Sequence, residues 1–288
     1  MTIWNLGSIN IDRVYRVAHL PGPGETLAAS DHTEGLGGKG ANMSVAAARA
    51  AAHVVHIGAV GGDGRWAAER LLEYGVDTRC IAEVSGPTGH AIIAVDAEGE
   101  NNILLYPGAN AAITGDMIGQ ALAQASPGDW LLMQNETAGQ SFAAEVAHKL
   151  GLNVAYAAAP FEAEAVQAVL PMLDLLVMNA VEAEQLEAAT GKAPGALGVA
   201  RVVVTQGAAG ATLFEGGEVH LFEAVPAEPV DTTGAGDTFT GYLIAGLSRG
   251  EDIAQAMTRA NLAASIMVTR VGTADVIPDL KDIEDARL

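Results

Sequence analysis

Short, nearly continuous apolar runs alternate with amphipathic segments along most of the chain. Six apolar runs predict β-strands, at Ile3–Ile9, Val54–Val60, Trp130–Gln134, Val154–Ala157, Leu175–Met178 and Val202–Thr205. Helical patterns lie between them, at Ala41–Ala51, Trp66–Tyr74, Gln140–Leu150, Ala163–Leu170 and Val181–Ala189, and two more helices are predicted between Gly234 and Arg270. Such an alternation is typical of an α/β fold with a mostly parallel sheet that helices cover on both faces.

Two stretches, at residues 12–35 and 88–107, break this alternation. In the second, Gly89–Asp96 and Asn101–Tyr106 flank the turn Ala97-Glu98-Gly99-Glu100, which is a hairpin signal. We expect both stretches to form a small projecting β-sheet, a lid, on an α/β core made of residues 1–11, 36–87 and 108–288.

Composition narrows the class of partner. The 288 residues carry a net charge of −20, which argues against nucleic acid as a partner because that binding needs many Lys and Arg side chains. No apolar run is long enough to span a membrane, and no secretory signal opens the chain. Cys80 is the one cysteine, so no internal disulfide is possible and a cytoplasmic location is expected.

Polar residues follow four of the predicted strands. Ligands of open parallel sheets bind at the carboxyl ends of the strands, so we expect these side chains to share one site. Asn179 also suits a purely structural role, as a helix cap. The residues concerned are Asn10 and Asp12, then Gln134, Asn135 and Glu136, then Asn179 and Glu182, then Thr205, Gln206 and Gly207.

The segment Asp231–Phe239 places two carboxylates around a glycine turn where a helix is predicted to begin. Unpaired amides at a helix start favour an anion such as phosphate, and the glycines allow its close approach. A carboxylate at Asp237 would repel phosphate. It makes more sense as a base that is directed at an attacking hydroxyl.

A second glycine cluster, Gly35–Asn42, contains the spacing G-x-G-x-x-G. A dinucleotide site is a poor interpretation, because the cluster does not follow the first strand and no acidic residue ends Val54–Val60. We interpret it as a turn whose backbone, together with Lys39 and Asn42, contacts a polyhydroxy ligand. The alternative for Lys39 is a solvated surface charge.

The sequence indicates neither a zinc site nor a catalytic serine. The histidines do not cluster with Cys80 or with acids at the spacing of zinc ligands. Ser8 and Ser44 have no indicated histidine partner, and no nucleophile elbow occurs.

These motifs resemble those of the ribokinase-like (PfkB) carbohydrate kinases, and the resemblance runs across nearly the whole chain. Gly7–Asp12 looks like the sugar-binding opening of the family, and Gly37–Asn42 like its first signature. Asp231–Asp237 is similar to its second signature, and Asn179–Glu182 to its N-x-x-E element. The resemblance implies a three-layer α/β/α fold with a small β-sheet lid.

The resemblance also implies a role for each site residue. Asp237 would be the general base, and the amides of Gly234, Ala235, Gly236 and Asp237 would form the anion hole. The sugar would be held by Asn10, Asp12, Gly38, Lys39, Asn42 and Glu136. ATP would lie along Asn179, Thr205, Gly207 and Gly236, with Mg²⁺ organised through water by Asn179 and Glu182. A monovalent cation, K⁺, would bind near Asp231, Thr233, Arg270 and Gly272.

The implied reaction is transfer of the γ-phosphate of ATP to the primary hydroxyl of a pentose, with D-ribose the first candidate. A homodimer formed through the lid is also expected, because pairing protects the exposed edges of the predicted lid sheet. Met43 stands where the family tends to carry glutamine, which leaves a nucleoside, fructose or another sugar open as the acceptor. Val276 stands where serine often lies near the cation site, so cation dependence is open. A non-catalytic sugar-sensing protein and a dinucleotide oxidoreductase are the remaining alternatives.

Overall fold

The computed structural model describes residues 1–286. Its main body is a nine-stranded sheet with the order β13-β12-β11-β10-β9-β8-β1-β4-β5. The strands β5, β4, β1, β8, β9, β10 and β11 are parallel, and the hairpin of β12 and β13 adds an antiparallel edge. Their bounds are β1 Thr2–Leu6, β4 His53–Val60, β5 Ile81–Glu83, β8 Trp130–Gln134, β9 Asn153–Ala157, β10 Leu175–Asn179, β11 Arg201–Thr205, β12 Ala211–Glu215 and β13 Glu218–Phe222.

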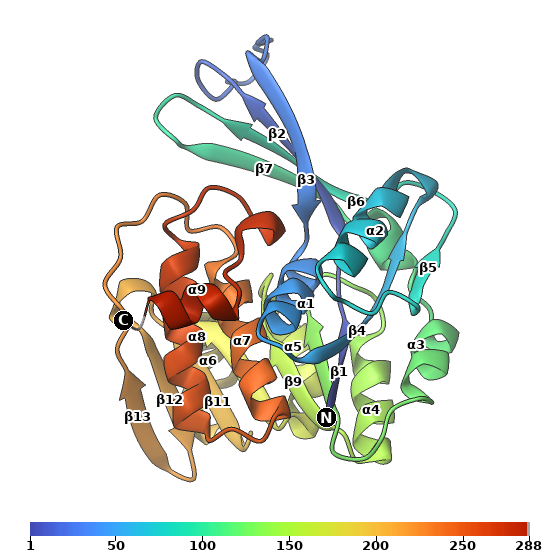
Figure 1. Cartoon of the computed structure of the whole chain (residues 1–288), viewed down its shortest axis with the longest axis vertical. Coiled ribbons are helices and arrows are strands. Elements are labelled where there is room, and N and C mark those ends of the chain that lie inside the picture. Colours follow the sequence, from blue (N-terminus) through green and yellow to red (C-terminus); the bar gives the residue numbers. More distant parts are fainter. Residues whose placement is uncertain (287–288) are drawn as a thin grey trace.

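Helices cover both faces of this sheet, as the hydrophobic pattern predicts (Figure 1). One apolar core lies beneath α1 Lys39–Arg49, α2 Arg65–Glu73, α7 Ala235–Ser248, α8 Ile253–Met267 and α9 Leu280–Asp285. A second core lies beneath α3 Gly115–Leu122, α4 Gln140–Leu150, α5 Ala163–Val169 and α6 Ala180–Thr190. The result is the three-layer α/β/α architecture. None of the helices within residues 1–286 is long and apolar enough to cross a bilayer.

Small residues bring the helices α1 and α7 close together. A Cβ added to Gly241 of α7 would lie 2.5 Å from the Cβ of Ala46 in α1, so a larger residue at either position would push the helices apart. This close contact matters because the N-termini of these two helices carry most of the candidate site.

A second, four-stranded sheet projects away from the main body (Figure 1). Its order is β3-β2-β6-β7, with β2 and β6 parallel and the other pairs antiparallel. The strands are β2 Asn10–Arg16, β3 Asp31–Gly37, β6 Gly89–Val95 and β7 Asn101–Tyr106. The sheet takes in residues 10, 11, 36 and 37, which the sequence assigned to the core. The division into core and lid domains stays a prediction.

Several elements differ from the sequence prediction. The first strand ends at Leu6 rather than Ile9, because the chain leaves the large sheet at Gly7 and enters the small sheet at Asn10. Asn10 and Asp12 therefore lie on a strand of the small sheet and do not simply follow a strand of the large one. The elements β5, β12, β13, α3 and α9 were not predicted. Short 3-10 helices complete the chain at Gly62–Gly64, Gly108–Ala112, Leu170–Met172, Pro194–Ala196, Gly207–Ala209 and Ala274–Val276.

Candidate active site

Asp237 lies in the first turn of α7, at the carboxyl ends of the parallel strands. Gly234 precedes the helix with φ +74°, a left-handed conformation that favours glycine. The Asp237 side chain is buried, and the Asn42 Nδ2 amide of α1 donates a 2.8 Å hydrogen bond to its Oδ2 atom. The two signature motifs, far apart in the sequence, thus meet at one carboxylate.

Lys39 is the cation among the acidic side chains of the site. Burial raises the pKa of Asp237, Lys39 and Asn42 oppose the rise, and the charges of Glu136 and Glu182 add to it. In turn, Asp237 raises the pKa of Lys39, with burial opposing and Glu136 adding to the rise. Lys39 is therefore charged, is only partly exposed and compensates the charges of Asp237 and Glu136, so it is not the solvated surface charge of the alternative interpretation.

The amides at the start of α7 are donors available for an anion. Within residues 1–286, the amides of Gly236 and Asp237 have no hydrogen-bond acceptor, as expected for the first turn of a helix. The Ala235 amide differs, since it donates to the Thr232 carbonyl at 3.3 Å. The Gly234 amide, which precedes the helix, likewise has no acceptor within residues 1–286, so the unpaired donors of this turn are those of Gly234, Gly236 and Asp237.

A cavity of about 250 Å³ opens in front of these amides. Its wall combines α7, the start of α1 and the ends of β9, β10 and β11. Of the predicted site residues, it brings together Lys39, Asn179, Glu182, Thr205, Gly234, Gly236 and Asp237. Met43 lies in the same wall, whereas Gly207 does not line this cavity.

The N-x-x-E element forms a capping box at the start of α6. The Asn179 Oδ1 atom accepts from the Glu182 amide at 2.8 Å, and the Glu182 Oε2 atom accepts from the Asn179 amide at 2.8 Å. The structural interpretation of Asn179 is thus confirmed. Both side chains also line the cavity, so the box holds the Asn179 Nδ2 and Glu182 Oε1 atoms in fixed positions at its wall.

Asp12 is a half-buried carboxylate on β2. Burial raises its pKa to about 7, with the charges of Glu136 and Asp237 adding to the rise and Lys39 opposing it. A Cβ added to Gly37 of the neighbouring strand would overlap the Asp12 carboxylate. Glycine at position 37 therefore makes the space that Asp12 occupies.

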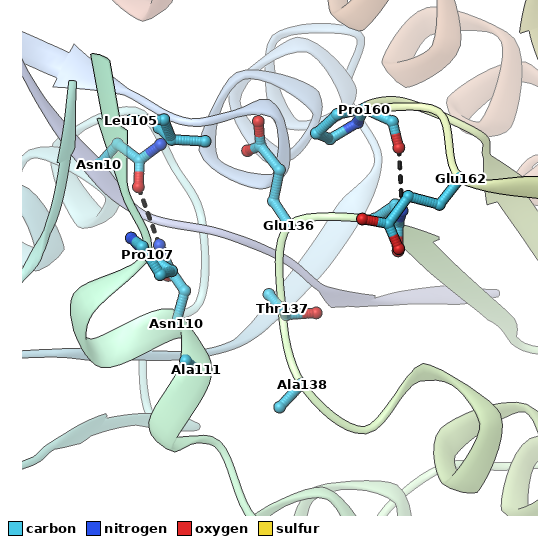
Figure 2. A pocket seen from close by; sticks show the side chains of 11 residues that line it. Asn10, Leu105, Pro107, Asn110, Ala111, Glu136, Thr137, Ala138, Pro160 and Glu162 are labelled. Atoms are coloured by element: carbon cyan, nitrogen blue, oxygen red, sulfur yellow. Dashed lines mark hydrogen bonds between the residues drawn. The ribbon is translucent and has the colours of Figure 1, made fainter. Parts of the chain in front are cut away.

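A second cavity, of about 380 Å³, contains Asn10 and Glu136 (Figure 2). The Asn10 Oδ1 atom accepts from Asn110 Nδ2 at 2.8 Å, which leaves the Asn10 Nδ2 atom free to donate to a ligand. Glu136 accepts hydrogen bonds at Oε2 from the Ser8 hydroxyl at 2.5 Å and from the Lys39 amide at 3.0 Å. Figure 2 shows its side chain between Asn10 and Pro160.

Ser8 and Asn110 are site residues that the sequence did not single out for these roles. Ser8 lies within the quoted Gly7–Asp12 motif, so its position was a usable signal. Asn110 is a lone asparagine in a 3-10 turn and gives no comparable signal.

The start of α1 also requires glycine. Gly38 has φ +92°, and a Cβ there would lie 3.0 Å from both the Asn10 amide nitrogen and the Ser8 carbonyl oxygen. The backbone that holds Lys39 thereby approaches the β2 strand closely.

The predicted cation residues lie together on two adjoining loops. The Asp231 carboxylate accepts from the Thr233 amide at 2.9 Å and from the Gly272 amide at 3.2 Å. The Arg270 side chain turns away to Asp282 and the Val276 carbonyl, so only its backbone is available to the site. Backbone carbonyls beside a carboxylate are the oxygen donors that a hard cation prefers.

One expectation about serine and histidine is wrong. The Ser44 Oγ atom lies 2.8 Å from His56 Nδ1, in the interior behind the site. Gln134, expected at the site edge, is also fully buried and donates to Asn5. Neither pair lines either of the two cavities described above. Within residues 1–286, no three His, Cys, Asp or Glu side chains gather as a metal-binding group.

A family model described as pfkB family carbohydrate kinase matches residues 2–280. A ribokinase from Haemophilus influenzae is 36% identical over 292 residues, which span 96% of this chain and 95% of that protein. A ribokinase structure from Thermotoga maritima superposes with a TM-score of 0.90 at 32% identity, covering 99% of this chain and 98% of the other. An Arabidopsis thaliana ribokinase complexed with ribose and ATP gives 0.86 at 29% identity, with coverage of 99% and 97%.

Proposed function

Because this chain belongs to the pfkB family of carbohydrate kinases, we propose that it transfers the γ-phosphate of ATP to the primary hydroxyl of D-ribose, forming ribose 5-phosphate. The observation that carries the proposal is the placement of Asp237. Its carboxylate follows unpaired amides at the start of α7 and is close enough to Glu136, Glu182 and Lys39 for their charges to act on it. A carboxylate in this position suits a base for an alcohol that attacks phosphorus.

Asp237 takes the proton from the primary hydroxyl as that oxygen attacks the γ-phosphorus. The bond between the γ-phosphorus and the β–γ bridging oxygen breaks, and ADP leaves. The anion hole of Gly234, Ala235, Gly236 and Asp237 stabilises the charge on the transferred group, with the free amides of Gly234, Gly236 and Asp237 as its main donors. Removing one such donor in other enzymes costs about 3 kcal/mol of transition-state stabilisation.

The sugar hydroxyls bind Asn10, Asp12, Gly38, Lys39, Asn42 and Glu136. Support comes from their unused hydrogen-bonding atoms, such as Asn10 Nδ2, which the contact of Asn10 Oδ1 with Asn110 leaves free. Carboxylates and amides of this kind accept and donate to the adjacent hydroxyls of a pentose. No aromatic side chain lines either cavity to stack on a base, which favours a free sugar over a nucleoside.

ATP lies along Asn179, Thr205, Gly207 and Gly236. Mg²⁺ fits beside Glu182 and Asn179 through water, because one carboxylate and one amide are too few for direct coordination and Mg²⁺ retains several waters. When bound, Mg²⁺ neutralises charge on the phosphates. K⁺ fits the Asp231 carboxylate and the carbonyls of Thr233, Arg270 and Gly272.

The lid sheet supplies the surface for a homodimer. β7 is an edge strand, and its Ile103, Leu104 and Leu105 side chains are 56%, 66% and 43% exposed. An apolar edge of this kind is a template for pairing with a second copy. Light scattering should give a dimer for the wild type and a monomer for Leu104→Asp; a monomeric wild type would contradict the proposal.

The test of the function is a coupled ADP-release assay over ribose, 2-deoxyribose, fructose and nucleosides, with ribose expected to give the highest kcat/KM. Asp237→Asn should lower kcat about a thousandfold while calorimetry shows nearly unchanged ribose binding. Asp63→Asn, a carboxylate outside both cavities, is the matched control. Full activity of Asp237→Asn would exclude the assigned base. Ribose binding without turnover of any acceptor would indicate a sensing protein.

With ATP as the substrate, we place the enzyme in the cytoplasm.

A further inference from the structure

Four buried polar side chains behind the site form one connected hydrogen-bonded chain. Asn5 of β1, Ser44 of α1, His56 of β4 and Gln134 of β8 all have no exposed surface. Gln134 Nε2 lies 2.9 Å from Asn5 Oδ1, and Asn5 Nδ2 lies 2.7 Å from Ser44 Oγ. Ser44 Oγ lies 2.8 Å from His56 Nδ1. None of the four lines either cavity, so none touches a bound ligand.

The direction of every bond in this chain follows from its two ends. Asn5 Nδ2 also donates to the Gly40 carbonyl at 2.8 Å, and His56 Nε2 lies 3.0 Å from the Gly7 carbonyl. A carbonyl can only accept, so the Asn5 amide nitrogen faces Gly40 and the His56 proton is on Nε2. His56 Nδ1 then accepts from the Ser44 hydroxyl, which in turn accepts from Asn5.

His56 is neutral in this arrangement. Burial lowers its pKa to about 4, with the hydrogen bond to Gly7 opposing the shift. A protonated imidazole would leave the Ser44 hydroxyl hydrogen without an acceptor. The network therefore has one protonation state and one set of donors at neutral pH.

The two carbonyls at the ends of the network belong to segments that carry the sugar-binding groups. Gly40 lies in the first turn of α1, directly after Lys39 and close to Asn42. Gly7 precedes Ser8, whose hydroxyl donates to Glu136 at 2.5 Å and accepts from the Gly40 amide at 3.1 Å. These segments also touch directly, since a Cβ added to Gly40 would overlap the backbone of Gly7.

We propose that the network of Gln134, Asn5, Ser44 and His56 positions the Gly7-Ser8 segment against the start of α1 and thereby sets the affinity for the acceptor sugar. These are positioning residues, because they act through Ser8, Glu136 and Lys39. The inference rests on the proposed kinase function. If either segment were held less firmly, Glu136 or Lys39 would move away from the sugar hydroxyls. The phosphate site on α7 would stay in place.

Two amide variants of His56 separate positioning from packing. The amide of His56→Gln reaches the former Nε2 position and can donate to Gly7. The amide of His56→Asn reaches only the former Nδ1 position, where it can accept from Ser44. We expect His56→Asn to raise KM for the acceptor about tenfold, equivalent to about 1.4 kcal/mol, with kcat within about twofold of the wild type. His56→Gln should remain within about twofold of the wild-type KM.

Tyr242→Phe is the matched control. It removes one buried hydrogen bond to a backbone carbonyl, from the Tyr242 hydroxyl to Pro278 at 2.7 Å, away from both segments. It should lower the melting temperature and leave KM unchanged. If His56→Asn behaves in the same way, the network is purely structural and the proposal fails. Equal increases in KM for both amide variants would also overturn it, because the bond to Gly7 would then have no role.

The assay uses whichever acceptor the wild type phosphorylates best. A preference for another sugar would therefore refute the choice of ribose and leave the comparison of variants intact. Ser44→Ala provides a second variant that keeps the ring of His56, and we expect its KM to lie between those of the two amide variants. A wild-type KM for Ser44→Ala would overturn the role of Ser44 as a link.

Discussion

Asp12→Asn should make the unliganded protein more stable at alkaline pH while it weakens sugar binding. Burial raises the pKa of Asp12 from its ordinary 3.8 to about 7, aided by the charges of Glu136 and Asp237. The folded protein then binds this proton more tightly than the unfolded chain does. The stabilisation is therefore fully present below pH 3.8 and is lost as the pH rises to about 7.

The size of this loss follows from the shift in pKa. One pKa unit corresponds to about 1.4 kcal/mol, so the rise at Asp12 implies a total loss of about 4 kcal/mol in the free energy of unfolding. About 3 kcal/mol of this loss falls between pH 5 and pH 8. An asparagine at position 12 does not ionise, so the variant keeps the part of the free energy of unfolding that the wild type loses as the pH rises.

Urea denaturation of both proteins at pH 5 and pH 8, without sugar or nucleotide, measures the effect. The stability difference between variant and wild type should grow by about 3 kcal/mol over this interval in favour of Asp12→Asn. Asp63→Asn is the control. Although burial opposes it, hydrogen bonds from Thr88 lower the pKa of Asp63, so its charge is constant over this pH range. A constant difference for Asp12→Asn would refute the reasoning.

Three further predictions concern the glycines and carboxylates of the site. Gly37→Ala should raise KM for the sugar at least about tenfold because the added Cβ displaces Asp12, whereas Gly35→Ala, with open space around it, should not. Glu182→Ala should destabilise the protein by about 1 kcal/mol in urea unfolding through loss of the capping box. Glu182→Gln should retain that stability and still need more Mg²⁺ for half-maximal activity; equal Mg²⁺ dependence would contradict the metal role. Asp231→Asn should raise the K⁺ concentration for half-maximal activity, and identical K⁺ titrations would exclude the assigned cation site.

The sequence predicted the layers because strong local signals carry them, whereas only the family resemblance implied that the two signatures share one site. Apolar runs mark the buried strands, and the glycine turn marks the start of α7. The β12–β13 hairpin was missed although Gly216 and Gly217, both with positive φ, form a turn that the sequence shows. Polar and apolar residues do alternate over Glu218–Leu221, but Val219 and Leu221 are each 63% exposed, so this edge strand has no buried face for the pattern to mark.

Contacts between distant polar residues were beyond sequence reasoning. Ser44 and His56 are separated by twelve positions on a helix and a strand, and nothing in either local pattern points to the other. The same holds for Asn10 and Asn110. The pairing of Asn10 with Asn110 depends on where the large sheet and the small sheet join, and that of Ser44 with His56 depends on how α1 packs on β4. Both arrangements follow from packing of the whole chain.

The strand β2 gives the molecule a built-in link between shape and selectivity. One end of β2 carries Asn10 and Asp12, and the other extends into the projecting sheet as far as Arg16. Lys39 and Asn42, by contrast, are anchored on the rigid α1–α7 pair. Any tilt of the projecting sheet would therefore change the spacing between the two halves of the proposed sugar site. If the proposed sugar site is formed in this way, a substitution at the far tip of the sheet would act on selectivity through the position of β2 alone, with every contacting side chain unchanged.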